Sequence, residues 1–156
     1  FSLKKKKTTP SFLAGLRLFL KKGVKMISTR GRYALRVMID LAEHRDDGYI
    51  PMKDVVSRQG ISKKYMEQIM PSLVKSGFVE GVHGKGGGYK LTRNPSEYTV
   101  GEILRSAEGD LAPVACLSCN AEECPRKKEC KTLPLWEKFN DITNDYFDSV
   151  TLESLL

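Results

Sequence analysis

Four cysteines lie within fifteen residues and are the side chains of this chain best suited to chemistry. They are Cys116, Cys119, Cys124 and Cys130, and their spacing reads C-x2-C-x4-C-x5-C. Thiolates are soft ligands that suit iron–sulfur clusters and zinc. Because no small-residue cleavage site follows the basic N-terminal segment, we expect no export signal. A metal or redox site is therefore favoured over a disulfide framework.

The spacing of the cysteines distinguishes between the possible sites. A zinc ribbon needs two separated C-x2-C pairs, and this loop has one, so zinc fits less well. The ferredoxin run C-x2-C-x2-C-x3-C-P does not match either, although Pro125 follows Cys124. Nearby basic residues favour thiolate over thiol and offset cluster charge. They are Arg126, Lys127, Lys128 and Lys131. We predict a small iron–sulfur cluster, with a thiol or disulfide switch as the alternative.

Composition indicates what kind of protein carries these cysteines. The chain has 156 residues, of which 40% are hydrophobic and 29% charged, enough for one domain with a buried core. A bilayer span needs ~20 apolar residues. The longest apolar segment, Ser11 to Leu20, is interrupted by Arg17. These features exclude a transmembrane protein, and we expect a cytoplasmic one.

The net charge of +7 is distributed unevenly along the chain. Residues 28–93 hold 12 basic and 7 acidic residues, whereas residues 94–156 hold 6 basic and 12 acidic ones. The positive half suits a polyanion such as DNA. Residues 1–25 hold eight basic residues and no acidic one. We interpret them as a disordered or non-native extension before Met26, with a membrane-surface helix as the alternative.

Apolar periodicity predicts a helix from Ser28, followed by two short helices joined by the turn Gln59-Gly60-Ile61. Ser62 is a good N-cap for the third helix, which we expect to end at Gly77. Two short helices across a glycine-containing turn are typical of a helix-turn-helix motif. Pro71 removes one backbone hydrogen bond, so we expect a kink in the second half of the third helix.

The N-terminal half of that third helix carries the side chains expected to face DNA. They are Lys63, Lys64, Tyr65, Glu67 and Gln68. Lysine suits phosphates, glutamine can bond adenine bidentately, and glutamate can accept from cytosine. The runs Phe78–Val82 and Tyr89–Thr92 predict a hairpin, or wing, whose glycine-rich tip offers His83 and Lys85 to DNA. One alternative is a helical bundle with a solvated charged face and an ordinary glycine-rich turn. The other is a winged helix that binds protein.

The C-terminal third is predicted to contain a helix, the cysteine loop and a second, longer helix. Thr99 and Glu102 form a capping box for a helix that ends at Gly109. The long helix begins at Pro134, and a mostly apolar series of its residues follows the 3-4 spacing of a coiled coil. They are Trp136, Phe139, Thr143, Tyr146 and Val150. Such a seam is too apolar to stand alone in water.

These segments give a mainly α fold with a small β-wing, namely a winged helix-turn-helix domain plus a long dimerisation helix. We assign the DNA-binding domain to 26–109, the cluster loop to 110–133 and the dimerisation helix to 134–156. The glycine run of the wing does not match a nucleotide-binding loop, because a strand follows it instead of a helix. No acid–base constellation surrounds the cysteines, so we predict neither an enzyme nor a small-molecule substrate.

From Met26 to Leu156 the chain resembles the IscR-type iron–sulfur cluster regulators of the Rrf2 winged-helix transcription factor family. The matching stretches are Ser28-Thr29-Arg30-Gly31-Arg32-Tyr33-Ala34-Leu35-Arg36, Gln59-Gly60-Ile61-Ser62, Tyr65-Met66-Glu67-Gln68, Gly84-Lys85-Gly86-Gly87-Gly88-Tyr89, and the cysteine loop followed by Trp136. The resemblance implies a homodimer that binds a double-stranded DNA operator and a [2Fe–2S] cluster held by three cysteines. In the nitric-oxide-sensing branch the cluster is often [4Fe–4S].

The resemblance also suggests which cysteines bind the cluster. Cys124 and Cys130 keep the family's C-x5-C spacing. We favour Cys116 as the third ligand and keep Cys119 as the alternative or the fourth. Relatives place a histidine three residues after the last cysteine, where this chain has Leu133. The fourth ligand therefore stays open between Cys119 and a residue of the partner subunit.

By position, the family's DNA contacts fall on Tyr65, Glu67 and Gln68, while His83 replaces the usual arginine of the wing. The implied function is a transcriptional regulator, acting as a repressor or an activator, whose operator binding is controlled by the cluster. Its expected targets are iron–sulfur cluster assembly genes. The alternative is a repressor on the same fold that senses nitric oxide or thiol redox state. Related regulators of cysteine metabolism generally lack the cluster cysteines.

Overall fold

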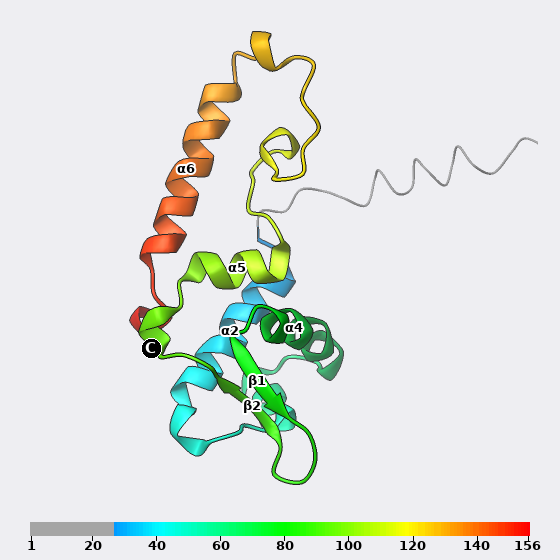
Figure 1. Ribbon diagram of the computed structural model, residues 1–156, viewed down its shortest axis with the longest axis vertical. Coiled ribbons are helices and arrows are strands. Elements are labelled where there is room, and N and C mark those ends of the chain that lie inside the picture. Colours follow the sequence, from blue (N-terminus) through cyan, green and yellow to red (C-terminus); the bar gives the residue numbers. More distant parts are fainter. Residues whose placement is uncertain (1–26) are drawn as a thin grey trace, which may run out of the picture.

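The computed structural model describes residues 27–156, so the expectations for residues 1–25 lie outside the described part (Figure 1). The helices and strands are α2 (Thr29–Glu43), α3 (Met52–Gln59), α4 (Lys63–Lys75), β1 (Val79–Val82), β2 (Gly88–Leu91), α5 (Val100–Glu108) and α6 (Leu133–Ser149). Mainly helical structure with a two-stranded wing confirms the predicted fold class. Within residues 27–156, no helix is long and apolar enough to cross a membrane.

The core of the winged domain lies where α2, α3, α4 and α5 meet. Helix α4 is the second helix of the helix-turn-helix motif and is called the recognition helix below, because it is the one predicted to face DNA. It contributes its apolar face, whose spacing matches helical periodicity. This buried face consists of Met66, Ile69, Met70 and Leu73. The side chain of Ser62 caps the helix by accepting from the backbone N–H of Tyr65, as predicted. The helix continues past Pro71 to Lys75, and its polar N-terminal side is left facing outward.

A buried carboxylate fixes the turn between α3 and α4 against α2. Asp40 is the one charged residue in the described part of the chain that is fully buried. It accepts hydrogen bonds from Arg58 at 3.0 and 2.7 Å and from the side-chain amide of Gln59 at 3.0 Å. Arg36, one turn before Asp40, also donates to the Gln59 side chain at 3.1 Å. The network therefore holds the end of α3 that leads into the recognition helix.

Acidification is expected to weaken the fold through Asp40. Burial alone would raise the pKa of this carboxyl, but hydrogen bonds from Arg58 and Gln59 and the charge of Arg58 outweigh it, so the pKa lies below its ordinary value. A pKa lowered by folding contributes stability above the unfolded pKa, about 4, and this stability is lost as pH falls through the folded pKa. We expect Asp40→Asn to lower the free energy of unfolding at neutral pH by ~1–3 kcal/mol.

Urea denaturation at neutral pH and near pH 3 measures both effects, because Asp40→Asn should also flatten the acid dependence. Asp46→Asn, at an exposed position of the loop after α2, is the matched control and should behave as the wild type does. An acid dependence that is unchanged in Asp40→Asn would contradict the assignment.

The wing is an antiparallel hairpin whose strands pair from Val79 with Leu91 to Val82 with Gly88. Its second strand begins and ends one residue earlier than predicted. Its bounds follow from its pairing with β1, in which Gly88 lies opposite Val82 and Leu91 opposite Val79. The same strand also bridges to Ile50, whose backbone exchanges hydrogen bonds of 2.9 and 2.8 Å with Tyr89. A Cβ at Gly88 would lie 2.3 Å from the Ile50 carbonyl oxygen, so only glycine permits this close approach. The bridge ties the wing to the segment that precedes α3.

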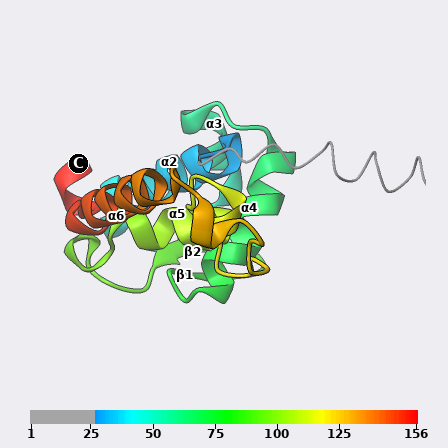
Figure 2. The same cartoon turned by 90° about the horizontal axis from the view of Figure 1, so that it is seen from above.

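Helix α5 leads from the winged domain to the cysteine loop. Thr99 and Glu102 form the predicted capping box, with both hydrogen bonds at 3.1 Å. Helix α6 packs its C-terminal end on α5, while its N-terminal end rises away from the winged domain (Figure 1). Seen from above, the cysteine loop lies at the end of α6 opposite the C-terminus (Figure 2).

The chain after α6 returns to the winged domain. The helix ends at Ser149, and the backbone N–H of Leu152 donates to the Tyr98 carbonyl at 2.9 Å. Leu152 is fully buried in the main core. Val150, placed on the seam by periodicity, packs instead on a small second core beside Leu104. The winged domain thus holds both ends of the unit formed by the cysteine loop and α6.

Candidate metal centre and nucleic-acid interface

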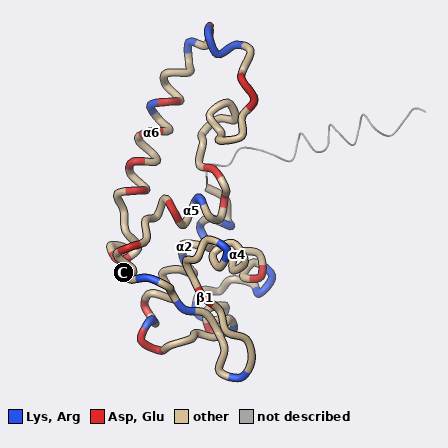
Figure 3. The backbone as a smooth tube through the Cα atoms, in the orientation of Figure 1, with Lys and Arg blue, Asp and Glu red and all other residues tan. Residues whose placement is uncertain are grey.

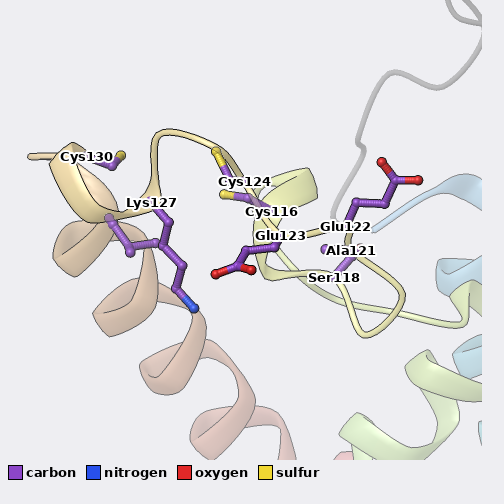
Figure 4. A pocket seen from close by; sticks show the side chains of 9 residues that line it. Cys116, Ser118, Ala121, Glu122, Glu123, Cys124, Lys127 and Cys130 are labelled. Carbon is purple, nitrogen blue, oxygen red and sulfur yellow. The ribbon is translucent and has the colours of Figure 1, made fainter.

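Three of the four cysteines line one hollow in the loop between α5 and α6. Cys116, Cys124 and Cys130 border a space of about 290 Å³. Figure 4 shows Cys116 and Cys124 on one side of it, and Cys130, on the turn before α6, on the other. Cys119 is exposed and is not among the lining residues. All four thiols are free of disulfide bonds.

The three lining cysteines do not form a site for a single metal ion. Among residues 27–156, no group of three or more His, Cys, Asp or Glu side chains is close enough to hold one ion. The ligands of a [2Fe–2S] cluster are divided between two irons, so its sulfur ligands stand around a space instead of meeting at a point. The donor set and the hollow suit a polynuclear group better than a lone zinc ion.

Hydrogen bonds within the loop order its two ends. At the start, Asp110 accepts from the backbone N–H groups of Ala112 at 2.7 Å and Cys119 at 2.8 Å. At the other end, Cys130 Sγ lies 3.5 Å from Thr132 Oγ1. Hydrogen bonding with Thr132, supported by the positive charge of Arg126, holds the pKa of the Cys130 thiol below its ordinary value. Cys130 is thereby favoured as a thiolate, the form that binds metal.

Two carboxylates of the hollow, Glu122 and Glu123, were missed by reasoning from the sequence. Lys127 and Leu133, both noted in the sequence, line it as well. The two glutamates directly precede Cys124 in the sequence, and this position beside a predicted ligand could have indicated that they line the same site. Leu133 contributes an apolar wall at the position where the resemblance would place a histidine.

The residues predicted to contact DNA from the recognition helix are all exposed on one side of α4. They are Lys63, Lys64, Tyr65, Glu67 and Gln68. Lys63 and Glu67 form an ion pair at 3.7 Å, which contributes little to stability because both side chains are more than half exposed. Tyr65 is 41% exposed, and its ring meets the Tyr33 ring edge-on with centroids 5.3 Å apart. Tyr33 of α2 therefore orients one of the proposed DNA contacts.

A groove of about 720 Å³ separates the recognition helix from the wing. Glu67 from α4 and His83 from the wing both line it, so the structure brings these two predicted residues together. Lys85 lies at the exposed wing tip and is not among the groove residues. Figure 3 shows basic residues at the wing tip and near α4, and several acidic residues along α6.

Comparison with known proteins places this architecture among transcriptional regulators. The family model Rrf2, described as an iron-dependent transcriptional regulator, matches residues 27–156. The HTH-type transcriptional regulator IscR of Pectobacterium atrosepticum is 35% identical over 83% of this chain and 78% of its own length.

Two solved structures are also similar. CymR, the global cysteine regulator of B. subtilis, has 35% identity and a TM-score of 0.66 over 83% of this chain and 94% of its own. T. potens IscR has 34% identity and a TM-score of 0.64 over 85% and 86%. The family and fold expected from the sequence are confirmed.

Proposed function

The chain belongs to the Rrf2 family of transcriptional regulators, and from this premise we propose that an iron–sulfur cluster held by its cysteine loop controls its binding to operator DNA. Its relatives are HTH-type regulators, so the chain is a DNA-binding regulator and not an enzyme. The observation that carries the proposal is the hollow bordered by Cys116, Cys124 and Cys130. We extend the proposal to a cytoplasmic location and to iron–sulfur cluster assembly genes as targets.

The proposed ligands are Cys116, Cys124 and Cys130, with [2Fe–2S] preferred over [4Fe–4S] and over zinc. Support comes from three soft donors around one space and from the lowered pKa of Cys130. When bound, the cluster supplies a group whose presence depends on iron, sulfide and oxidants. The fourth position is proposed for Cys119 or for a residue of the partner subunit. The position of Cys119 outside the hollow favours the partner subunit.

Two chains are proposed to bind one operator as a homodimer. Their recognition helices would enter the major groove about 34 Å apart, one helical turn, on a near-palindromic site. The wing would place His83 and Lys85 beside the neighbouring backbone or minor groove. Dimerisation is proposed along α6, where large apolar side chains remain exposed on one face. They are Leu135, Phe139, Ile142 and Tyr146.

The test is to purify the protein without oxygen and to compare its colour, metal content and DNA binding before and after exposure to air. We expect about two irons and two sulfides per chain, the content of a [2Fe–2S] cluster. Operator affinity should differ by about 5-fold or more between the loaded and cluster-free forms. Colourless protein that takes up no iron and sulfide on reconstitution would overturn the cluster proposal while leaving DNA binding intact.

Replacing Gln68 with alanine is expected to weaken operator binding by about 10-fold to 100-fold, because a bidentate base contact is worth ~1–3 kcal/mol. Fluorescence anisotropy with a duplex that the wild-type protein selects from a randomised pool measures the change. Lys64→Ala is the matched comparison, since a phosphate contact should weaken operator and unrelated DNA alike and reduce the salt dependence. Equal losses on both duplexes for Gln68→Ala would contradict its role in reading bases.

A second candidate function is sensing by the thiols themselves, favoured by the similarity to a cysteine regulator of B. subtilis. The lowered pKa of Cys130 also suits a reactive thiolate. In that case colourless protein would lose or gain operator affinity on mild oxidation and recover on reduction. A sensor of nitric oxide on the same fold would instead require the cluster and respond to nitric oxide while it is bound.

A further inference from the structure

Glu108, in the last turn of α5, holds the beginning of helix α2. Its Oε1 atom accepts hydrogen bonds from the Ser28 backbone N–H at 2.8 Å, the Ser28 hydroxyl at 2.8 Å and the Gly31 backbone N–H at 3.0 Å. A carboxylate is well placed there, because the first backbone N–H groups of a helix lack partners within the helix and carry partial positive charge. The contact joins residues eighty positions apart in the sequence.

Gly31 leaves the space that this carboxylate occupies. A Cβ built at Gly31 would lie 2.4 Å from Glu108 Oε1, a distance at which one of the two groups must move. The nearest atoms to that Cβ are all in the Glu108 side chain, so the space is specific to this contact. Gly31 has no need of a left-handed backbone, because its φ is not positive. Its role in the helix is therefore to admit Glu108.

The same short segment also anchors the cysteine loop. Two residues after Glu108, the carboxylate of Asp110 accepts from the backbone N–H of Cys119 at 2.8 Å. Gly109, between the two acidic residues, has a φ of 85° and ends α5. Glu108 thus bonds to the winged domain while Asp110 bonds to the loop. Only Gly109 separates the residue that bonds to α2 from the residue that bonds to the loop.

Helix α2 in turn contacts the recognition helix directly. Two residues after Gly31, the Tyr33 ring packs edge-on against the Tyr65 ring of α4. The Arg30 guanidinium, next to Gly31, donates to the Ser72 hydroxyl of α4 at 3.4 Å. The start of α2 therefore lies between Glu108 and the helix proposed to read DNA.

We propose that Glu108 is a positioning residue that transmits the state of the cysteine loop to the recognition helix within one chain. The inference rests on the proposed function, since it requires a cluster whose presence changes operator affinity. Glu108 itself contacts neither the hollow nor the DNA-facing side chains among its bonded partners. Its action runs through the position of α2.

Two substitutions disturb the contact from opposite sides. Glu108→Gln keeps the shape but replaces charge-assisted hydrogen bonds with weaker neutral ones. Gly31→Ala introduces the Cβ that displaces the carboxylate, and alanine favours a helix more than glycine does. Glu97→Gln is the matched control, because Glu97 accepts from the Asn94 backbone N–H at 2.9 Å in a similar cap that lies before α5 and does not bond to α2 or to the cysteine loop.

The readout is the ratio of operator affinities of the cluster-loaded and cluster-free protein, measured by anisotropy on the duplex selected with the loaded wild type. We expect a wild-type ratio of about 5-fold to 150-fold. Glu108→Gln and Gly31→Ala should each lower this ratio at least threefold, whereas Glu97→Gln should retain it. A purely structural role would change both affinities by the same factor and leave the ratio intact.

The possible failures are distinguishable. If the wild-type ratio is close to one, the proposed function is overturned and the coupling with it. If the wild type has a clear ratio and both variants keep it while folding and loading normally, the role of Glu108 alone is overturned. Thermal unfolding and iron content of each variant establish that it folds and loads.

Discussion

Replacing Ile142 with glutamate is expected to separate the proposed dimer into monomers and to lower operator affinity by about 100-fold or more, because a monomer loses the gain from binding two half-sites at once. Ile142 is 54% exposed in the chain and lies in the middle of the α6 stripe. Its neighbours Leu135, Phe139 and Tyr146 are 60%, 42% and 63% exposed. A buried, unpaired carboxylate at the centre of such an interface is strongly unfavourable.

Light scattering coupled to gel filtration measures the assembly, and anisotropy measures the affinity. Glu137→Lys is the control, since position 137 lies nearly opposite the stripe on a helix with 3.6 residues per turn and its side chain is exposed. The control should remain dimeric. A dimer that persists in Ile142→Glu with unchanged affinity would place the interface elsewhere.

Replacing Cys130 with alanine is expected to remove nearly all bound iron and sulfide. Cys130 borders the hollow, and the lowered pKa of its thiol favours the thiolate that binds metal. Its loss therefore removes a ligand that is already in the metal-binding form. Cys116→Ala and Cys124→Ala should behave in the same way. Iron and sulfide assays after anaerobic reconstitution, together with the visible absorbance, measure the result.

Cys119→Ala is the matched control because it removes the same chemical group from the same loop outside the hollow. We expect it to keep most of its iron. If Cys119→Ala loses the cluster and Cys116→Ala keeps it, the choice between these two cysteines is wrong. Circular dichroism and binding to unrelated DNA identify any variant that fails to fold.

Features set by neighbouring residues were predictable from the sequence. The cap at Ser62 and the capping box of Thr99 and Glu102 follow from side chains that bond to backbone a few residues away. The stops at Gly60 and Gly109 follow from the positive φ that glycine tolerates at a helix end. These local signals locate the helix-turn-helix and the beginning and end of α5. Because the family resemblance joined several of them in order, the fold class could also be predicted.

Contacts between distant segments were not predictable in this way. The bonds of Glu108 to Ser28 and of Asp40 to Arg58 join polar residues whose types alone would suit a solvated surface. No periodic pattern in the sequence predicts that Leu152 is buried in the core. Each of these contacts depends on how the helices pack against one another, which local patterns in a single sequence do not predict.

The seam on α6 shows the limit of periodicity most clearly. A 3-4 spacing identifies an apolar helix, yet it does not tell which side packs within the chain and which stays exposed. Trp136 and Val150, both expected on the seam, are half-buried, while Ile142 is exposed. The prediction of the site was incomplete in a similar way. The spacing of the cysteines could not distinguish Cys116 from Cys119 as a ligand, and only the folded loop shows that Cys116 borders the hollow.

The separation of charge between the winged domain and α6 has a consequence for how the molecule meets DNA. Residues 28–93 carry five more basic than acidic residues, whereas α6 has four acidic residues and one basic residue (Figure 3). The field of a DNA duplex is expected to exert a torque on this arrangement, turning the recognition helix and wing toward the phosphates and α6 away from them before contact. The acidic side chains of α6 are thus expected to contribute to the speed and direction of association, an effect that salt screens over about 8 Å at physiological ionic strength.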